Sequence, residues 1–216
     1  MKKVFVIIIG LMLMLIVSTG CSQPQTESRS LSEKEIQTVN EAFEPLLPAN
    51  KGDMTEITSS DGEFTLNPIS HFFTSYYDKP ENLDIGKFVY YIPRETFVTP
   101  EDEKELKKLK ELEGFPFDNI DNSPVPFGRI PFAIVEKYLK KYMNVSLDDM
   151  TNMGDALYLE EYETFYSYAS DFGPGIFHCI RGEINGDIVT LYSKNAVLTL
   201  KKDDTNYYII SHVSIE

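Results

Sequence analysis

The spacing of apolar residues changes once along this chain, and that change constrains its fold more than any other feature. Up to about residue 150 the apolar positions recur every three or four residues, as on one face of a helix. From residue 158 onward they alternate, as on one face of a strand. Helices first and antiparallel strands last predict an α+β domain, with the helices packed on one face of a C-terminal sheet.

Helical signals precede the change. Ser32 and Glu35 form a capping box, in which each side chain satisfies the backbone N–H of the other residue. Asn67-Pro68 also reads as a helix start, with an N-cap followed by a proline in the first turn. Residues 83–92 fit either a strand or a short helix. The predicted helices cover residues 32–47, 67–77, 99–113 and 131–143.

Strand signals follow, and they predict an antiparallel meander of four to five strands. Asn185-Gly186 is the strongest short hairpin signal in the chain. A two-residue turn at these positions would place Ile180 opposite Leu191. The predicted strands cover residues 158–169, 176–184, 187–193, 197–202 and 207–215.

The order of helices and strands resembles the cystatin-like or NTF2-like curved-sheet architecture. This resemblance concerns the fold alone and implies nothing about activity. Residues 67–77 and 158–175 also resemble a set of uncharacterised extracytoplasmic lipoproteins of Gram-positive type. That second resemblance assigns no role to any residue.

The beginning of the chain predicts export. Lys2 and Lys3 form a short positive segment, and residues 4–17 that follow carry no charge. This stretch is too short to cross a bilayer as a helix, which takes roughly 20 apolar residues. It falls within the range of about 7–15 residues that is typical of the apolar core of a signal peptide.

A cysteine follows the apolar stretch directly. Thr19 and Gly20 precede Cys21, and this order resembles the lipobox of bacterial lipoproteins, although Ser18 stands where Leu is usual. The resemblance implies cleavage after Gly20 and a diacylglyceryl group, with acyl chains such as palmitate, on the Cys21 sulfur. Two acyl chains suffice for stable anchoring, because each buried CH₂ contributes about 0.8 kcal/mol.

These signals divide the chain into three parts. We expect a lipoprotein signal peptide over residues 1–20, a lipidated flexible tether over residues 21–31 and a single α+β extracytoplasmic domain over residues 32–216. The tether is predicted because residues 22–30 contain no apolar side chain. The expected location is the outer face of the bacterial cell membrane.

The net charge limits the molecules that this protein can bind, and the cysteine content limits the disulfides that it can form. The net charge is −14, and removing Lys2 and Lys3 from the 20 basic residues leaves 18 against 34 acidic ones, or −16. Nucleic acid is excluded as a partner, because phosphate binding needs a basic surface. With Cys21 acylated, Cys179 has no disulfide partner, which is unusual for an exported protein. We expect it to be a small buried hydrophobic residue.

A tyrosine-rich run is the main candidate for a ligand-binding site. A continuous strand would place five polar and aromatic side chains on one face, namely Tyr158, Glu160, Tyr162, Tyr166 and Tyr168. Aromatic faces stack on sugars or cations, and phenolic hydroxyls orient polar groups. The alternative is that tyrosine favours strands, with its ring in the core and its hydroxyl at the rim.

Other candidate groups are less specific. Glu160, Glu161 and Glu163 could bind Ca²⁺ or act as an acid–base pair, although their spacing fits neither an EF-hand nor a glycosidase pair. A solvated strand edge is the simpler explanation of these carboxylates, and we favour it. Asp171-Phe172-Gly173 spells the magnesium motif of kinases, but no other kinase motif accompanies it, so we interpret it as a turn.

The histidines and serines carry no recognised motif. His71, His178 and His212 have no zinc-ligand spacing, and His178 and His212 could be neighbours across the sheet. The chain has no nucleophile elbow of the G-x-S-x-G type. We therefore expect no cofactor, no metal and no enzymatic activity.

Together these patterns favour a membrane-anchored module that binds a ligand or interacts with a partner. Its expected partners are the membrane, reached through Cys21, and a small-molecule or protein ligand. Two alternatives stay open. One is a surface hydrolase that acts on cell-wall or sugar substrates through carboxylates near Glu160 and Glu163. The other is an accessory subunit of a membrane complex.

Lipidation of Cys21 is directly testable. We expect mass spectrometry of the native protein to show a chain that begins at Cys21 and carries a diacylglyceryl group on that sulfur. Cys179 should carry no modification and serves as the internal control. An unmodified thiol at Cys21, or a leader that is still attached, would contradict the prediction.

Overall fold

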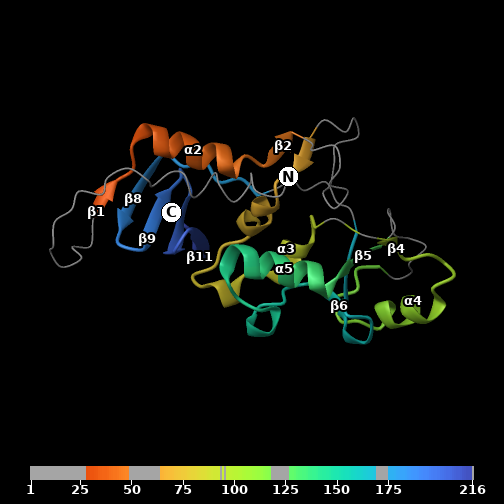
Figure 1. Cartoon of the computed structure of the whole chain (residues 1–216). Coiled ribbons are helices and arrows are strands. Elements are labelled where there is room, and N and C mark those ends of the chain that lie inside the picture. The colour runs from red at the N-terminus through yellow and green to blue at the C-terminus, as the bar shows by residue number, and fades with distance from the viewer. Residues whose placement is uncertain are drawn as a thin grey trace.

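The computed structural model describes residues 28–48, 64–92, 94, 96–117, 127–168 and 175–215. These residues form an α+β fold with antiparallel sheets of five, two and four strands. Figure 1 shows the five-stranded sheet at one end of the molecule and the four-stranded sheet at the other, with α3 and α5 between them. Within these ranges no helix is long and apolar enough to cross a membrane. The predicted signal peptide and Cys21 lie outside the described residues.

The five-stranded sheet contains the predicted C-terminal meander. Its strand order is β1-β8-β9-β10-β11, and every neighbouring pair is antiparallel. The strands are β1 (Ser28–Ser30), β8 (Arg181–Asn185), β9 (Ile188–Tyr192), β10 (Ala196–Asp203) and β11 (Asn206–Ser214).

Strand β1 corrects the predicted tether. Residues 28–30 were expected to be free chain, but they pair with β8 at the edge of the sheet. An edge strand needs backbone N–H and C=O groups and no apolar side chain, so composition alone could not reveal it. Arg29 reinforces the attachment by a bidentate ion pair with Glu35 in α2, at 2.6 and 2.9 Å.

The β8–β9 hairpin forms as predicted, but its turn lies one residue later. The two loop residues are Gly186 and Asp187, and Gly186 adopts φ +64°, which costs glycine little because it has no Cβ. As a result Gly182, and not Ile180, lies opposite Leu191. This register differs by two residues from the predicted one, so every side chain keeps its expected face.

Most helices begin where the sequence indicated, but several are shorter, and the helix predicted from residue 99 begins only at Glu103, after a turn. Both halves of the Ser32–Glu35 capping box are present at the start of α2. Asn67 caps the next helix as predicted, although the turns that follow are 3₁₀ and not α. The ambiguous residues 83–92 contain a short helix, α3. The α-helices are α2 (Glu33–Phe43), α3 (Ile85–Val89), α4 (Glu103–Lys110) and α5 (Phe132–Met143), and the 3₁₀ helices are η2 (Pro68–Phe73), η3 (Pro80–Asn82), η5 (Leu147–Asp149) and η6 (Glu160–Tyr162).

The four-stranded sheet was not predicted. Its order is β4-β5-β7-β6, and it gathers strands from the middle of the chain. The prediction of one strand over residues 158–169 is wrong, because η6 and Glu163, with φ +46°, turn the chain back on itself. The strands are β4 (Thr96–Phe97), β5 (Gly128–Pro131), β6 (Leu157–Leu159) and β7 (Thr164–Ser167), and a separate pair comprises β2 (Leu46–Pro48) and β3 (Phe64–Leu66).

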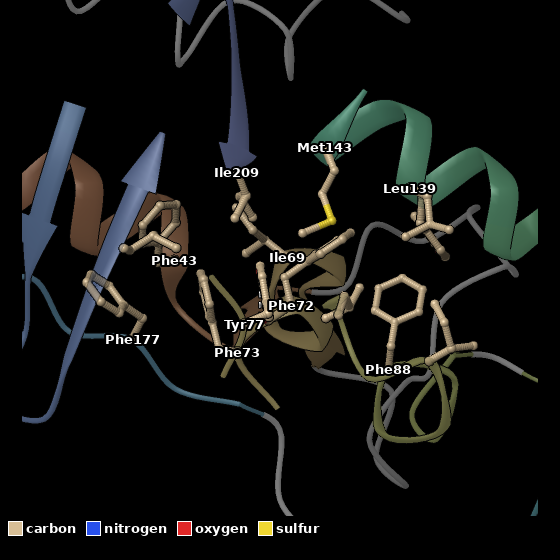
Figure 2. Packing of buried hydrophobic residues seen from close by; sticks show 14 of the residues in the cluster. Phe43, Ile69, Phe72, Phe73, Tyr77, Phe88, Leu139, Met143, Phe177 and Ile209 are labelled. Atoms are coloured by element: carbon tan, nitrogen blue, oxygen red, sulfur yellow. Dashed lines mark hydrogen bonds between the residues drawn. The ribbon is translucent and has the colours of Figure 1, made fainter. Parts of the chain in front are cut away.

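One apolar cluster joins the two larger sheets. It includes Leu198 from the five-stranded sheet and Phe165 from the four-stranded sheet, both fully buried. Phe72 and Phe88 lie near its centre, with ring centroids 4.8 Å apart (Figure 2). Cys179 is buried in the same cluster, as predicted, and burial raises the pKa of its thiol.

Truncating a central ring should show how strongly this cluster stabilises the fold. We expect Phe88→Ala to lower the free energy of unfolding by about 3–5 kcal/mol, since a fully buried ring is lost and a cavity remains. Phe97→Ala is the matched control, because 47% of that side chain is exposed and its loss should cost less than about 1 kcal/mol. Urea unfolding followed by circular dichroism measures both. Equal losses in the two variants would contradict the assignment of the core.

Candidate functional site

A cavity of about 490 Å³ lies between the end of η2, helix α3 and the β6–β7 hairpin. We call it the tyrosine cavity and define it by the polar and aromatic side chains in its lining. These are Phe73, Thr74, Asp84, Lys87, Tyr90, Tyr91, Asp155, Tyr166, Ser167 and Tyr168.

The tyrosine rings are arranged at steep angles to one another. The Tyr90 ring centroid lies 5.3 Å from that of Tyr91, at an interplanar angle of 65°. It lies 5.9 Å from the centroid of Tyr168, at 73°. Phe117 and Phe127 pack against Tyr168 at 5.2 and 5.5 Å, so the ring of Tyr168 is held in place. Flat apolar ligands can stack on such fixed rings.

Helix α3 holds Tyr90 and Tyr91 beside the hairpin. Asp84 caps the helix by accepting a hydrogen bond from the backbone N–H of Lys87 at 3.0 Å. Gly86 permits close packing, since a Cβ at this position would lie 2.8 Å from the backbone nitrogen of Asp155. The backbone N–H of Gly86 also donates to the carbonyl of Met153 at 3.1 Å. These contacts, one of them from the Asp84 side chain of the lining itself, fix this wall of the cavity.

An arginine lies against the cavity lining. Arg94 Nε donates a hydrogen bond to Ser167 Oγ at 2.9 Å. Its aliphatic part crosses Gly128, where a Cβ would lie only 1.9 Å from Arg94 Cδ. Burial lowers the pKa of the guanidinium, and the neighbouring Tyr90 acts in the opposite direction. The arginine is therefore half-buried and held at two points.

The Tyr91 hydroxyl is the other unusual polar group of this lining. It is buried and has no hydrogen-bond partner in the part of the chain that the structure describes. Burial raises the pKa of Tyr91, and the neighbouring Tyr90 raises it further. A buried hydroxyl without a partner costs free energy, so its presence beside a cavity is informative.

The structure brings together only two of the five predicted ligand-binding residues. Tyr166 and Tyr168 line the tyrosine cavity. Tyr158 lies elsewhere and packs against Phe165, with ring centroids 4.5 Å apart. Glu160 is exposed, and Tyr162 packs against the smaller apolar cluster behind the four-stranded sheet. The hairpin is the reason, because it places Tyr158 and Tyr166 on opposite faces of the sheet.

Two aromatic residues of the site, and the arginine beside it, were missed. Tyr90 and Tyr91 lie within a segment whose secondary structure was ambiguous in the sequence, and Arg94 follows it. Two consecutive tyrosines followed by an arginine were a visible signal. However, nothing in the local pattern indicated that they meet the β6–β7 hairpin, more than sixty residues later in the chain.

The candidate carboxylates have other contacts. Glu161 forms an ion pair with Lys108 in α4, and the Glu163 carbonyl accepts a hydrogen bond from the backbone N–H of Phe132 at 2.8 Å. Among the described residues no group of His, Cys, Asp and Glu side chains is placed to hold a metal ion. Asp171-Phe172-Gly173 lies outside the described residues.

The histidines have different surroundings. His178 precedes β8 and is exposed. His212 is buried, and its Nδ1 lies 2.8 Å from the carbonyl oxygen of Ser75. His71 is also buried, and burial lowers its pKa to about 4. His178 and His212 therefore do not form a shared site.

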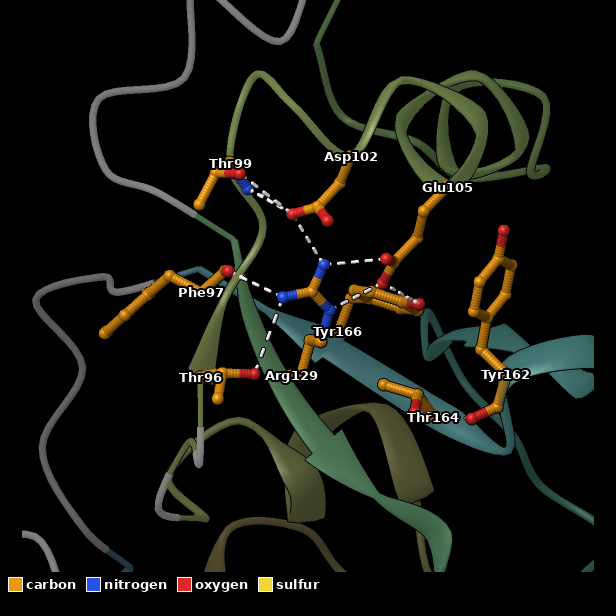
Figure 3. A network of polar contacts seen from close by, with 9 residues as sticks. All are labelled: Thr96, Phe97, Thr99, Asp102, Glu105, Arg129, Tyr162, Thr164 and Tyr166. Atoms are coloured by element: carbon orange, nitrogen blue, oxygen red, sulfur yellow. Dashed lines mark hydrogen bonds and ion pairs between the residues drawn. The ribbon is translucent and has the colours of Figure 1, made fainter.

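A second polar cluster joins α4 to the four-stranded sheet (Figure 3). Arg129 donates two hydrogen bonds to Glu105, both at 2.7 Å, and one to the carbonyl of Phe97 at 2.6 Å. It also forms an ion pair with Asp102 at 2.8 Å. The Tyr166 hydroxyl donates to Glu105 at 2.6 Å. We call these residues the Arg129 network.

The Arg129 network is self-contained. The hydrogen bonds from Arg129 hold the pKa of Glu105 below its ordinary value, and Glu105 in turn raises the pKa of Arg129. Burial, followed by the hydrogen bond to Glu105, raises the pKa of Tyr166. Since the single guanidinium is paired with two carboxylates of the same fold, we interpret the network as structural. It fixes β7, and therefore one wall of the tyrosine cavity.

The comparisons with known proteins add no relative. No family model matches the chain, and neither a curated protein nor a solved structure matches it. The resemblance to cystatin-like or NTF2-like folds therefore stays a prediction.

The Arg129 network should stabilise the fold in a pH-dependent way. We expect Glu105→Gln to lower the free energy of unfolding by about 2–4 kcal/mol at neutral pH, because it breaks a largely buried bidentate pair. The folded-state pKa of Glu105 is depressed, so this contribution is present above the ordinary pKa of 4.5 and is lost as pH falls through the folded-state value. Urea unfolding at neutral and acidic pH measures the difference.

Glu161→Gln is the matched control. It removes one carboxylate from the Lys108 pair, in which 60% of the Glu161 side chain is exposed, so its effect should be less than about 1 kcal/mol. The wild-type protein and Glu105→Gln should differ less in their free energy of unfolding in acid than at neutral pH. An equal difference at both pH values would contradict the assigned role of Glu105.

Proposed function

We propose that this protein is a lipid-anchored extracytoplasmic binding protein that holds a small molecule in the tyrosine cavity. The observation that carries the proposal is the cavity itself. Its volume of about 490 Å³ falls within the range of roughly 300–1,000 Å³ that is typical of small-molecule sites. Its lining combines aromatic rings with a few polar groups, which is the usual composition of such sites.

The polar groups favour binding over catalysis. Ser167 Oγ accepts its hydrogen bond from Arg94, a permanently charged donor that cannot act as a general base. The lining that the structure describes contains neither histidine nor cysteine. The hydrolase and the accessory subunit stay predictions from the sequence, and no contact in the described residues favours either.

The anchor would keep this site close to the membrane. Cys21 precedes Ser28, the first residue of β1, by about seven residues, which can span at most about 25 Å when fully extended. Because β1 is paired with β8, the domain would be tethered through the edge of its five-stranded sheet. A short tether of this kind suits a receptor that captures a solute next to the membrane.

A ligand screen with a matched pair of variants tests the proposal. We expect some members of a panel of small metabolites to raise the melting temperature of the mature protein in detergent micelles. A ligand at a hundred times its Kd adds about 2.7 kcal/mol of stability. Tyr168→Leu should abolish the shift, because it removes a ring and a hydroxyl from the cavity but keeps an apolar side chain.

Tyr208→Leu is the control. Tyr208 pairs with Lys201 in the five-stranded sheet and does not line the cavity, so the shift should persist in this variant. Ligand-induced shifts that are unaffected by Tyr168→Leu would contradict the assigned site. Turnover of a bound compound would contradict the assignment as a binding protein.

A further inference from the structure

Tyr76 is an exposed aromatic residue that the fold holds in a fixed position. It is 56% exposed, although its neighbours Ser75 and Tyr77 are both buried. His212 contacts both neighbours. Its Nδ1 lies 2.8 Å from the carbonyl oxygen of Ser75, and its backbone exchanges two hydrogen bonds with that of Tyr77, at 2.7 and 2.9 Å. The backbone at Tyr76 is therefore fixed on both sides.

The ring of Tyr76 also has a rigid support. Its centroid lies 4.9 Å from that of His212, at an interplanar angle of 39°. The buried ring of His212 packs in turn against Phe73 and Phe177, at centroid distances of 5.6 and 6.0 Å. One face of the Tyr76 ring therefore rests on the core, and the other face is open to solvent. A ring that is fixed before a ligand arrives loses little conformational entropy on binding.

Asp78 lies on the same side of the chain as Tyr76. Tyr77 forms a β-bridge with His212, so the backbone is extended here, and side chains two residues apart point in the same direction. Tyr77 is buried accordingly, whereas Tyr76 and Asp78 are exposed. Asn82 Nδ2 donates a hydrogen bond to Asp78 Oδ1 at 2.7 Å, which lowers the pKa of this carboxyl. At neutral pH an aromatic ring therefore lies beside a carboxylate.

An open hollow of about 590 Å³ adjoins this ring and carboxylate. It lies between the segment after η2, the end of η3 and the end of β11, and we call it the Tyr76 hollow. Among the described residues of its lining, Asp78 carries the only charge. Neutral amides and hydroxyls come from Asn82, Thr151, Asn152 and Ser214. The hollow therefore offers mainly uncharged donors and acceptors.

The amides of the Tyr76 hollow are held in place and keep binding capacity. Thr151 Oγ1 lies 2.9 Å from Asn82 Oδ1, and Asn152 Nδ2 donates to the carbonyl of Asn82 at 3.2 Å. An amide nitrogen carries two N–H groups, and a carboxylate accepts several hydrogen bonds. The described contacts use one N–H of Asn82 and one of Asn152. A second N–H on each amide, and the exposed carboxylate of Asp78, can therefore bind a ligand.

This combination of groups fits a sugar ring. A sugar ring presents a face of C–H groups, which can stack on an aromatic side chain. Its hydroxyls can donate to a carboxylate and accept from an amide N–H group in the same pose. An organic cation would also be attracted to a tyrosine and a carboxylate, but it could not accept hydrogen bonds from the two amides.

We propose that the Tyr76 hollow is a binding site for a neutral carbohydrate. One sugar ring stacks on Tyr76. Its hydroxyls donate to Asp78 and accept from the amides of Asn82 and Asn152. Within the described residues the hollow shares no lining residue with the tyrosine cavity, so this inference goes beyond the proposed function and does not depend on it.

A single fluorescent reporter tests for binding at this position. The chain has no tryptophan, so Tyr76→Trp introduces one indole and keeps a ring for stacking. Cellotetraose or chitotetraose, two neutral oligosaccharides, should shift its emission. The mature protein is studied in micelles of a polyoxyethylene detergent, because a detergent with a sugar headgroup would compete. Tyr208→Trp is the control, since Tyr208 pairs with Lys201 and does not line the hollow, and its emission should stay unchanged.

Matched variants locate the binding site. Isothermal titration with the oligosaccharide that binds should show an affinity about tenfold lower in Tyr76→Ala, which removes the stacking ring. Asp78→Asn should also lower the affinity about tenfold, since hydrogen bonds to a charged acceptor are the stronger ones. Asp187→Asn is the control, because it removes the same charge from an exposed turn outside the hollow and should change nothing. Circular dichroism confirms that each variant is folded, and if Tyr76→Ala is not, Asp78→Asn and Tyr76→Trp decide.

The outcomes separate the inference from the proposed function. Tyr168→Leu should leave the affinity for the oligosaccharide unchanged, because Tyr168 lines the tyrosine cavity. The inference is overturned if neither oligosaccharide binds at millimolar concentration, if Asp78→Asn leaves the affinity intact, or if choline, a cationic probe, binds more tightly than both. Oligosaccharide binding that Tyr168→Leu abolishes and Tyr76→Ala leaves intact would also overturn it, while the binding function of the tyrosine cavity would stand.

Discussion

The packing around η2 is the interaction on which the rest of the structure depends. Its two phenylalanines serve different parts of the core. Phe72 contacts Phe88 and Tyr142, at centroid distances of 4.8 and 5.3 Å, and so joins α3 to α5. Phe73 packs on Phe43 and Phe177, at 5.3 and 5.6 Å, on the side of α2 and the five-stranded sheet. Buried rings of this size contribute several kcal/mol each, so η2 joins α3 and α5 to α2 and the five-stranded sheet.

The packing around η2 also determines where the tyrosine cavity lies. Phe73 and Thr74, at the end of η2, line the cavity together with Gly175, where a Cβ would lie 2.4 Å from the carbonyl carbon of Phe73. The opposite wall is the end of β7, whose position the Arg129 network fixes from the other face of the sheet. The cavity therefore lies where η2 and α3 meet the edge of the four-stranded sheet. Such junctions commonly hold ligands, because each side can be rigid without filling the space between them.

Local signals predicted the local structure, and long-range contacts account for what was missed. The Ser32 capping box and the C-terminal hairpins were visible because they depend on residues close in sequence. The four-stranded sheet was not visible, since β5 pairs with β7 across more than thirty residues and neither strand alternates strongly. The chain turns at Glu163, which has a positive φ although it is not a glycine. No sign of the turn was therefore visible in the sequence, and the tyrosine run was predicted as one strand. Tyr166 and Tyr168 were found by composition, whereas Arg94 meets Ser167 from 73 residues away in the sequence, so no local pattern could indicate that contact.

Arg129 and Arg94 contact opposite faces of β7 and differ in their partners. Tyr166 and Ser167 are consecutive residues of β7, so their side chains point to opposite faces of the sheet. Arg129 meets Tyr166 on one face, where it is paired with both Glu105 and Asp102. Arg94 meets Ser167 on the other face, where no described carboxylate pairs with it. One strand therefore has an ion pair of the fold on one face and, on the other, a half-buried arginine whose described hydrogen bond goes to a neutral hydroxyl, so the two faces of β7 are stabilised by different kinds of contact.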